Sequence, residues 1–321
     1  MFESYEEIRR WKDEHLIGVR TDPNKLNQLH DQVMKHVLEI AVKKIAGEVP
    51  CSFEWFITGS GGRYEQGLIS DQDHGFVFEQ TDSQTTGYFL KLGEEVSDGL
   101  YMAGYPYCLG KVMASNPLWC KSLEEWKVQL FQWMEEESWE SIRHLQIFYD
   151  ARALTGTGQF VSELKDYIHQ YKHEHPVLLK RLLENVMHLK SSIGPLGQIL
   201  TIEKGKYSGC VDLKYSAFIP YVNAIRLLAM KEEIQETTTV DRMKILLERE
   251  AYGKELVMYN QCFHNLLKYR ASLLNEVEDY EDTHYLKIKQ LNKEERREIK
   301  KILKNAKSIH QYVANMIEKG V

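Results

Sequence analysis

The segment of the sequence most suited to chemistry is 59–73, GSGGRYEQGLISDQD. It starts with a glycine-rich turn and ends with two aspartates separated by one residue, Asp71 and Asp73. Alternate side chains of a strand project to the same face, so these two carboxylates would lie side by side. Carboxylates that close repel one another unless a cation lies between them, and hard oxygen ligands near phosphate favour Mg²⁺. The pattern therefore predicts that Asp71 and Asp73 hold a metal ion.

The turn that opens this segment could receive the phosphate groups of a ligand. Gly59 and Ser60 leave backbone N–H groups open to phosphate oxygens, and Arg63 can add a charged, forked donor. Each piece has an ordinary alternative, because a glycine cluster is often only a turn and an aspartate pair is often only a polar strand end. Together, in this order, they favour phosphoryl chemistry. The sequence contains neither GxxxxGK[ST] nor GxGxxG, which argues against kinases of the P-loop class and against dehydrogenases.

The elements that must position these residues follow from the spacing of the apolar side chains. Helical spacing runs through 26–45, 89–100 and 126–134, and strand patterns cover 53–57, 71–78 and 146–149. Glycines and prolines interrupt 104–117, which we expect to be a long ordered loop. From Val161 onward almost only helical spacing remains. We therefore expect the fold class α/β plus all-α, with an α/β domain at 1–158 and a helical-bundle domain at 159–321.

Four stretches of the chain resemble a known family. They are 59–73, then 104–119 (GYPYCLGKVMASNPLW), 147–156 (IFYDARALTG) and 211–230 (VDLKYSAFIPYVNAIRLLAM). The first two resemble a bacterial signal-transduction nucleotidyltransferase family that is related to protein-PII uridylyltransferase and glutamine-synthetase adenylyltransferase. The last is similar to the helical C-terminal substrate-binding domain of that family.

The resemblance implies the nucleotidyltransferase β-fold, in which a third carboxylate on a neighbouring strand joins the aspartate pair. Asp150 is the candidate, because the expected strand 146–149 ends at it. Its alternative role is a helix N-cap or a turn residue. The implied catalytic and metal-binding set is then Asp71, Asp73 and Asp150, with two Mg²⁺ ions expected and Mn²⁺ as the alternative metal.

The activity implied by the resemblance is transfer of AMP or UMP from a nucleoside triphosphate to a hydroxyl of a protein or a small molecule, with release of pyrophosphate. Gly59, Ser60, Arg63, Lys111 and Asn116 are the expected nucleotide contacts. Lys111 and Asn116 have an equal alternative, which is to pack the loop at 104–117. A nucleotide-binding regulatory sensor with little turnover is the second function class.

The helical domain is expected to bind the acceptor and to cover the metals, because an open strand edge alone cannot exclude water or choose an acceptor. The short link at 155–159 favours contact between the two domains, with 211–214 facing the metals. Asp212, Lys214 and Arg226 could face such a cleft, although charged residues near a helix interior are more often paired structurally.

Composition limits the setting of this chemistry. The formal net charge of −6 argues against a protein that coats nucleic acid. The basic stretch at 287–319 could bind RNA or an acidic partner, but its apolar spacing favours the solvated face of an amphipathic helix. The five cysteines form no CxxC pair, and the sequence shows neither the apolar core of a signal peptide nor a membrane-spanning stretch. We expect reduced thiols and a cytoplasmic protein that makes no contact with membranes.

Overall fold

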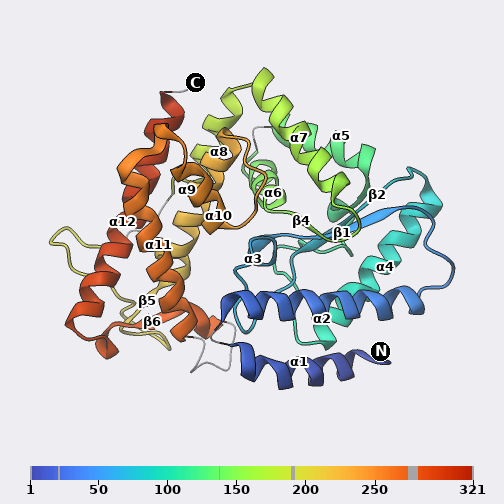
Figure 1. The fold of residues 1–321 in the computed structure, drawn as a ribbon, viewed down its shortest axis with the longest axis horizontal. Coiled ribbons are helices and arrows are strands. Elements are labelled where there is room, and N and C mark those ends of the chain that lie inside the picture. The colour runs from blue at the N-terminus through green and yellow to red at the C-terminus, as the bar shows by residue number, and fades with distance from the viewer. Residues whose placement is uncertain (1, 21, 137, 189–191, 274–280, 320–321) are drawn as a thin grey trace. The chain divides into compact units, whose positions relative to one another are not determined.

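The computed structural model describes residues 2–20, 22–136, 138–188, 192–273 and 281–319 (Figure 1). The chain forms two compact units, Met1–Tyr171 and Lys172–Val321. The division lies inside α7 (Gln159–Glu174), beyond the boundary at residue 158 that the sequence suggests. None of the described helices is both long and apolar enough to cross a membrane.

The first unit is a mixed α/β structure around a four-stranded sheet, which confirms the first half of the expected fold class. The strands lie in the order β3-β2-β1-β4, with β1 antiparallel to β2 and β4, and β2 parallel to β3. In chain order its elements up to α7 are α1 (Tyr5–Val19), α2 (Pro23–Lys44), β1 (Phe53–Ile57), α3 (Gly59–Gly62), β2 (His74–Phe78), α4 (Ser83–Met102), η1 (Pro117–Trp119), β3 (Cys120–Ser122), α5 (Leu123–Glu135), α6 (Trp139–Tyr149) and β4 (Arg152–Thr155).

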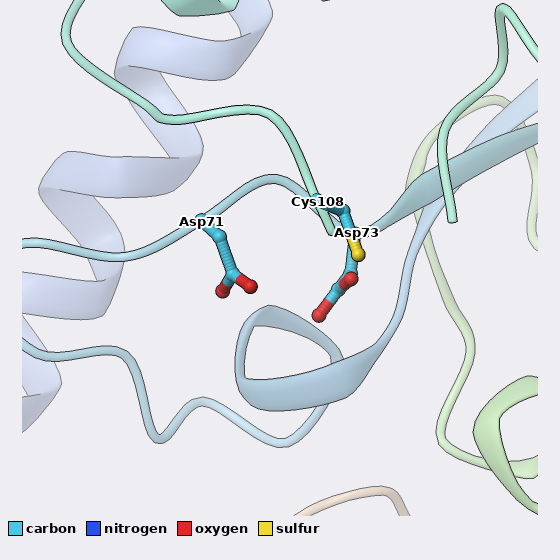
Figure 2. Close-up of side chains that lie close together, drawn as sticks. All are labelled: Asp71, Asp73 and Cys108. Carbon is cyan, nitrogen blue, oxygen red and sulfur yellow. The ribbon is translucent and has the colours of Figure 1, made fainter. Parts of the chain in front are cut away.

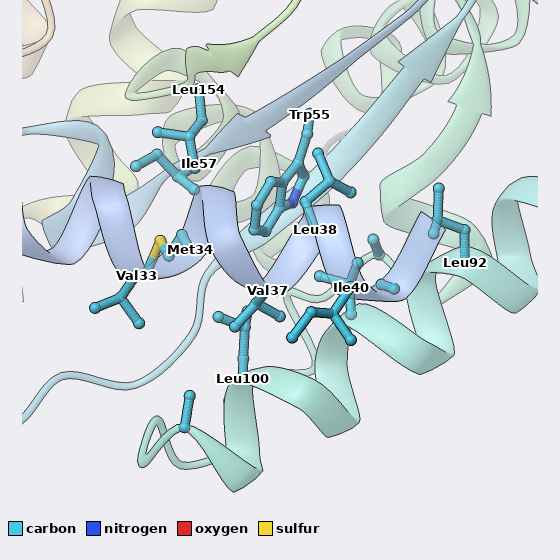
Figure 3. Close-up of a cluster of buried hydrophobic side chains, with 14 of the residues drawn as sticks. Val33, Met34, Val37, Leu38, Ile40, Trp55, Ile57, Leu92, Leu100 and Leu154 are labelled. Carbon is cyan, nitrogen blue, oxygen red and sulfur yellow. The ribbon is translucent and has the colours of Figure 1, made fainter. Parts of the chain in front are cut away.

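Helices cover both faces of the sheet, α2 and α4 on one face and α5 and α6 on the other, and α1 packs on the outer side of α2 and α4 (Figure 1). Strand residues at alternate positions divide between the layers. On the first face, Trp55 and Leu154 pack in one cluster with Val37 of α2 and Leu100 of α4 (Figure 3). On the second face, Phe56 makes edge contacts with Trp126 of α5 and Phe148 of α6. Burial on both faces fixes the register of the sheet, because a shift by one residue would exchange the two layers' contacts.

The expected strand at 146–149 is wrong, because these residues form the last turn of α6. Ser138 caps the start of this helix, and Ile142, Leu145 and Phe148 are buried along it at helical spacing. A short run of aromatic and branched residues fits a strand and a buried helix turn equally well, so its length alone did not decide. The strand that pairs with β1 is β4, which begins three residues after the helix ends.

The expected strand at 71–78 begins only at His74, although Asp71 and Asp73 still precede it directly (Figure 2). The helices expected at 26–45, 89–100 and 126–134 are present as α2, α4 and α5. The stretch 104–117 runs without a regular helix or strand up to η1, as its glycines and prolines predict.

The second unit is largely helical, which confirms the second half of the fold class. Its central helix, α9 (Ile219–Lys231), is apolar almost all round and contacts three other helices of the unit, α8, α10 and α12. A two-stranded antiparallel pair, β5-β6, adds a small sheet that the sequence did not predict. The remaining elements are α8 (Val177–Val186), β5 (Cys210–Asp212), the π-helical turn η2 (Lys214–Phe218), α10 (Thr239–Leu247), η3 (Glu250–Tyr252), α11 (Gly253–Leu273), η4 (Glu281–His284), β6 (Tyr285–Lys287), η5 (Ile288–Gln290) and α12 (Lys293–Glu318).

Candidate metal-binding and nucleotide-binding site

The two aspartates of the DQD sequence lie together at the entrance to β2. Their carboxylates and the Sγ atom of Cys108 offer ligand atoms that all lie within 4.8 Å of one another (Figure 2). Among the described residues, these are the only three His, Cys, Asp or Glu side chains grouped in this way. The prediction that Asp71 and Asp73 project to the same side is therefore confirmed.

Backbone hydrogen bonds on both sides hold this segment extended. The N–H of Thr58 donates to the carbonyl oxygen of Asp73 at 2.9 Å, which ties the segment to the end of β1. On the other side, the N–H of Gln72 donates to the carbonyl of Pro106, and that of His74 donates to the carbonyl of Val112, each at 3.1 Å. The loop at 106–112 is thus paired alongside the aspartates, and this pairing brings Cys108 to them.

The residues that alternate with the aspartates are locked on the opposite side. Gln72 is fully buried, and its amide nitrogen donates to the carbonyls of Ser97 and Tyr105. The Nδ1 atom of His74 accepts a hydrogen bond from the indole N–H of Trp55 at 3.1 Å, so the proton of His74 is on Nε2, which donates to the side-chain oxygen of Gln72. Burial lowers the pKa of His74 to about 3, which keeps the ring neutral. A fixed Gln72 leaves the two aspartates facing away from the core.

Two positions of the turn α3, Gly59 and Gly62, need glycine because atoms of other residues lie where a side chain would be. Gly59 has a φ of +56°, and a Cβ atom there would lie 2.2 Å from Oδ2 of Asp73. A Cβ atom at Gly62 would lie 2.1 Å from the carbonyl oxygen of Asp150. The short turn α3 therefore packs directly against the side chain of Asp73 at one end and the backbone of Asp150 at the other. The first N–H groups of any helical turn lack partners within it, so those of Gly59 and Ser60 are not used by the turn's own hydrogen bonds.

Arg63 and Asp150 form a buried ion pair. The Nη1 atom of Arg63 donates to Oδ2 of Asp150 at 2.7 Å, and its Nε atom donates to Oε2 of Glu65 at 2.7 Å. Burial opposes the charge of the guanidinium, but the two carboxylates outweigh it and raise the pKa of Arg63 above its ordinary value. This pairing ties the turn α3 to the C-terminal end of α6, where Asp150 is the C-cap. Glu65 thus orients Arg63, as expected for a carboxylate beside an arginine.

Asp150 is not part of the group around Asp71 and Asp73. The expectation that it joins them rested on a strand that the structure replaces with a helix, so Asp150 caps a helix end and pairs with Arg63 instead. The strands beside β2 offer no substitute at this end: β3 has no carboxylate, and Glu54 of β1 lies opposite Val77, away from Asp73. The carboxylate of Glu54 accepts hydrogen bonds from the N–H groups of Phe160 and Val161 at the start of α7.

Polar residues of α2 support the glycine turn, a role that the sequence reading missed. His30 donates through Nε2 to the carbonyl of Gly67 at 2.9 Å and accepts from the hydroxyl of Tyr105 at Nδ1, and burial lowers its pKa to about 4. Asp31 accepts two hydrogen bonds from Arg152, whose Nε donates to the carbonyl of Gly61. The signal was present in the sequence, because His30 and Asp31 follow Asn27 at three and four residues and so interrupt the otherwise apolar face of that helix.

The remaining residues expected to contact a nucleotide are Ser60, Lys111 and Asn116, and they differ in their local contacts. The hydroxyl of Ser60 is 3.2 Å from that of Ser70. Asn116 donates to the carbonyl of Lys111 at 2.9 Å and accepts from the N–H of Leu118, so it packs the loop and caps η1. Lys111 itself is exposed, with a φ of +55°, at the end of the turn that starts at Cys108.

The sequence predicts only a reduced thiol at Cys108, although this residue lies inside the 104–119 motif. Burial, and after it the charge of Asp73 and a hydrogen bond to that residue, raise the pKa of Cys108 to about 12. The thiol is therefore neutral near pH 7 and donates to the Asp73 carboxylate. Sulfur is a soft donor and a poor ligand for a hard cation, which leaves the two carboxylates as the preferred donors. This donor set of two carboxylates fits Mg²⁺ or Mn²⁺.

Charged residues expected near a cleft in the helical half have partners within their own unit. Asp212 accepts a hydrogen bond from the N–H of Tyr215, Lys214 lies 3.3 Å from Nε2 of His284, and Arg226 donates to Asn223. All three side chains thus make local contacts that stabilise the second unit, which is the structural alternative given for them above.

An α/β unit that carries the paired aspartates, followed by a helical unit, is the arrangement expected of the nucleotidyltransferase family. Two family matches agree: residues 19–140 match the family described as Putative nucleotidyltransferase DUF294, and residues 176–317 match the Putative nucleotidyltransferase substrate binding domain. The chain belongs to this DUF294 family and carries its C-terminal substrate-binding domain. No curated protein matches the chain.

Proposed function

We propose that the protein transfers AMP or UMP from a nucleoside triphosphate to a hydroxyl group of a protein or a small molecule. The observation that carries the proposal is the pair of carboxylates, Asp71 and Asp73, beside the turn that starts at Gly59. In such a transfer the acceptor oxygen forms a bond to the α-phosphorus. The bond between that phosphorus and the bridging oxygen breaks, pyrophosphate leaves with the electron pair, and the acceptor proton is lost to solvent.

Asp71 and Asp73 would hold the divalent cation, Mg²⁺ or Mn²⁺. When bound, the cation neutralises the triphosphate and stabilises the charge on the leaving pyrophosphate. The expectation of two ions rests on the family resemblance.

The turn 59–62 supplies the phosphate contacts in this proposal. Gly59 and Ser60 present backbone N–H groups beside the metal site, and Lys111 is exposed on the loop that carries Cys108. Arg63 acts as a positioning residue, because its guanidinium is 5% exposed and engaged with Glu65 and Asp150. Asp150 has the matching role: while Arg63 holds its carboxylate, it is not available as a base for the acceptor.

The helical half of the chain is proposed to bind the acceptor. The support is its match, over residues 176–317, to a substrate-binding domain of this nucleotidyltransferase family. Binding of the acceptor by this half would give the enzyme its choice of acceptor.

A nucleotide-binding sensor with little turnover is the second candidate. It is favoured by one observation, namely that two carboxylates, rather than three, form the metal group among the described residues. The two candidates share binding of a metal and a nucleoside triphosphate and differ only in turnover.

The test is incubation of the full chain with each α-labelled nucleoside triphosphate, Mg²⁺ and a lysate of its own cell. Label on a macromolecule or a small molecule, in one of the four reactions, is the expected result. The labelled product must disappear with Asp71→Asn or Asp73→Asn and persist with Glu48→Gln, a matched change at an exposed position. Binding of a triphosphate without any labelled product would favour the sensor instead.

A further inference from the structure

A basic pocket lies in the second unit, between the start of α12 and the segment 197–199. Its volume is about 610 Å³, which falls in the range of about 300–1,000 Å³ that small-molecule sites occupy. Four cationic side chains and no carboxylate line it. The residues on which the argument depends are Gly197, Ile199, Leu291, Lys293, Arg297 and Lys300.

Three of the cations project from one face of α12. Lys293, Arg297 and Lys300 follow at intervals of four and three residues, so they lie along a single helical stripe, and all three are exposed. The fourth, Arg296, has a different role. Its Nε donates to the carbonyl of Leu291 at 2.9 Å and its Nη2 to that of Lys289 at 3.1 Å, so it fixes the wall of the pocket.

In the part of the chain that the structure describes, none of these three cations takes part in an ion pair, although Glu294 stands three residues before Arg297 on the same helix. No carboxylate there lies within 4.0 Å of the charged nitrogens of Lys293, Arg297 or Lys300 in any described ion pair. Two carboxylates of the same helix are engaged elsewhere: Glu295 accepts from the backbone N–H of Asn292 in the capping box, and Glu298 accepts from Tyr269 at 2.7 Å. A ligand that brings negative charge would therefore meet free donors.

The opposite wall is a tight turn. Ile193 and Ile199 form a bridge, and the N–H of Gly194 donates to the carbonyl of Gln198 at 2.9 Å. Gly197 has a φ of +74°, and a Cβ atom there would lie 3.3 Å from Nζ of Lys300. The glycine thus lets the backbone approach the lysine closely, while Ile199 and Leu291 add apolar surface between the two walls.

We propose that this pocket binds a small molecule that carries two or more phosphate groups. Three cations on one wall match such a ligand in charge, and the apolar side chains receive its non-phosphate part. A nucleic acid is the less suitable ligand, because it would follow the basic stripe onward to Lys304 and Lys307, beyond the residues that line the pocket. The proposal does not depend on the activity proposed above, since it involves none of the residues around Asp71 and Asp73.

The test is a calorimetric titration of the full chain with inorganic pyrophosphate, in EDTA and at low salt. The protein carries Asp71→Asn and Asp73→Asn, so the proposed active site cannot contribute through a metal. We expect binding that weakens at least about tenfold in Arg297→Gln/Lys300→Gln. The control, Lys304→Gln/Lys307→Gln, removes the same charge from exposed positions on the same helix and should change the affinity less than about twofold.

Two outcomes would overturn the proposal. The first is that pyrophosphate does not bind to the protein in which the pocket residues are unchanged. The other is equal weakening by the two double substitutions, which would assign the binding to diffuse charge along α12. A single-stranded RNA is titrated in parallel, and affinity for it that depends equally on both pairs would identify a nucleic-acid surface in place of the pocket.

Discussion

Gly59 and Asp73 approach so closely that a side chain on the first would displace the second. A Cβ atom at position 59 would lie 2.2 Å from Oδ2 and 3.0 Å from Cγ of Asp73. The contact joins the end of β1 to the entrance of β2, so the turn and the carboxylate can occupy their places only together. The glycine of the GS sequence thus shapes the metal site as well as the phosphate-facing turn.

Gly59→Ala is therefore expected to weaken metal binding and to remove nucleotide transfer while the fold persists. The alanine must adopt a φ near +56°, and its methyl group must push the Asp73 carboxylate aside. Titration with Mn²⁺, followed by electron paramagnetic resonance, measures the effect directly. The control is Gly87→Ala in α4, where a Cβ atom would meet nothing within 4 Å. It should bind Mn²⁺ normally and gain about 0.5–1 kcal/mol of stability. Equal Mn²⁺ affinity in the two variants would contradict the steric argument.

Cys108→Ser should retain Mg²⁺-supported transfer to within about threefold, since sulfur is a soft donor and not a good ligand for a hard cation. The serine hydroxyl can replace the thiol as a donor to Asp73. Asp73→Asn, by contrast, removes a ligand and should lower the transfer rate by about two to three orders of magnitude. Initial rates of the two variants at saturating Mg²⁺ check the prediction. A loss in Cys108→Ser as large as that in Asp73→Asn would make the thiol a metal ligand.

Arg63→Met should destabilise the protein by about 3–5 kcal/mol, because it removes the guanidinium that pairs with the buried carboxylate of Asp150. Asp150 is fully buried and Arg63 is 5% exposed, so water cannot replace the lost contact. Urea unfolding, followed by circular dichroism, measures the change. Adding Asp150→Asn should recover part of the loss, because it removes the buried negative charge that Arg63 offset. The contrary outcome would be simple additivity, in which the free energy of unfolding that the double variant loses equals the sum of the losses in Arg63→Met and Asp150→Asn. The two side chains would then not act as a pair.

Stability of the first unit should decrease as the pH falls below about 6.5, the ordinary pKa of histidine. Burial lowers the pKa of His74 to about 3 and that of His30 to about 4, so the folded state excludes protons that the unfolded state binds. Their stabilising contribution is therefore complete above pH 6.5 and is lost as the pH falls towards the lowered values. Each histidine contributes a slope of about 1.4 kcal/mol per pH unit in that window.

The measurement is the free energy of unfolding in urea at several values between pH 4.5 and 7. His30→Gln should be less stable at neutral pH, since it loses hydrogen bonds, but its stability should depend less steeply on pH than that of the unchanged protein. His15→Gln, a change at an exposed histidine, should leave the slope as it is. Parallel curves for all three proteins would show that His30 does not exclude a proton in the folded state.

Much of the site follows from local sequence, because side-chain direction depends on local backbone geometry. The spacing of Asp71 and Asp73 placed both carboxylates on one side, and the glycines at 59 and 62 stand where other atoms approach most closely. The order of helices and strands likewise predicted a mixed α/β half followed by a helical half, since each element has its own period of apolar residues.

Only the tertiary structure decided which distant segments meet at these aspartates. Residues 106–112 pair with 72–74 and bring Cys108 to the carboxylates, whereas Asp150 ends a helix and pairs with Arg63. Spacing along the chain contains no information on such partners. The short run 146–149 had no period long enough to separate a strand from a buried helix turn, and packing against Phe56 and Trp126 settled it as a helix. The carboxylate of Asp150 therefore pairs with Arg63 and does not join Asp71 and Asp73, because a buried guanidinium requires a partner of opposite charge.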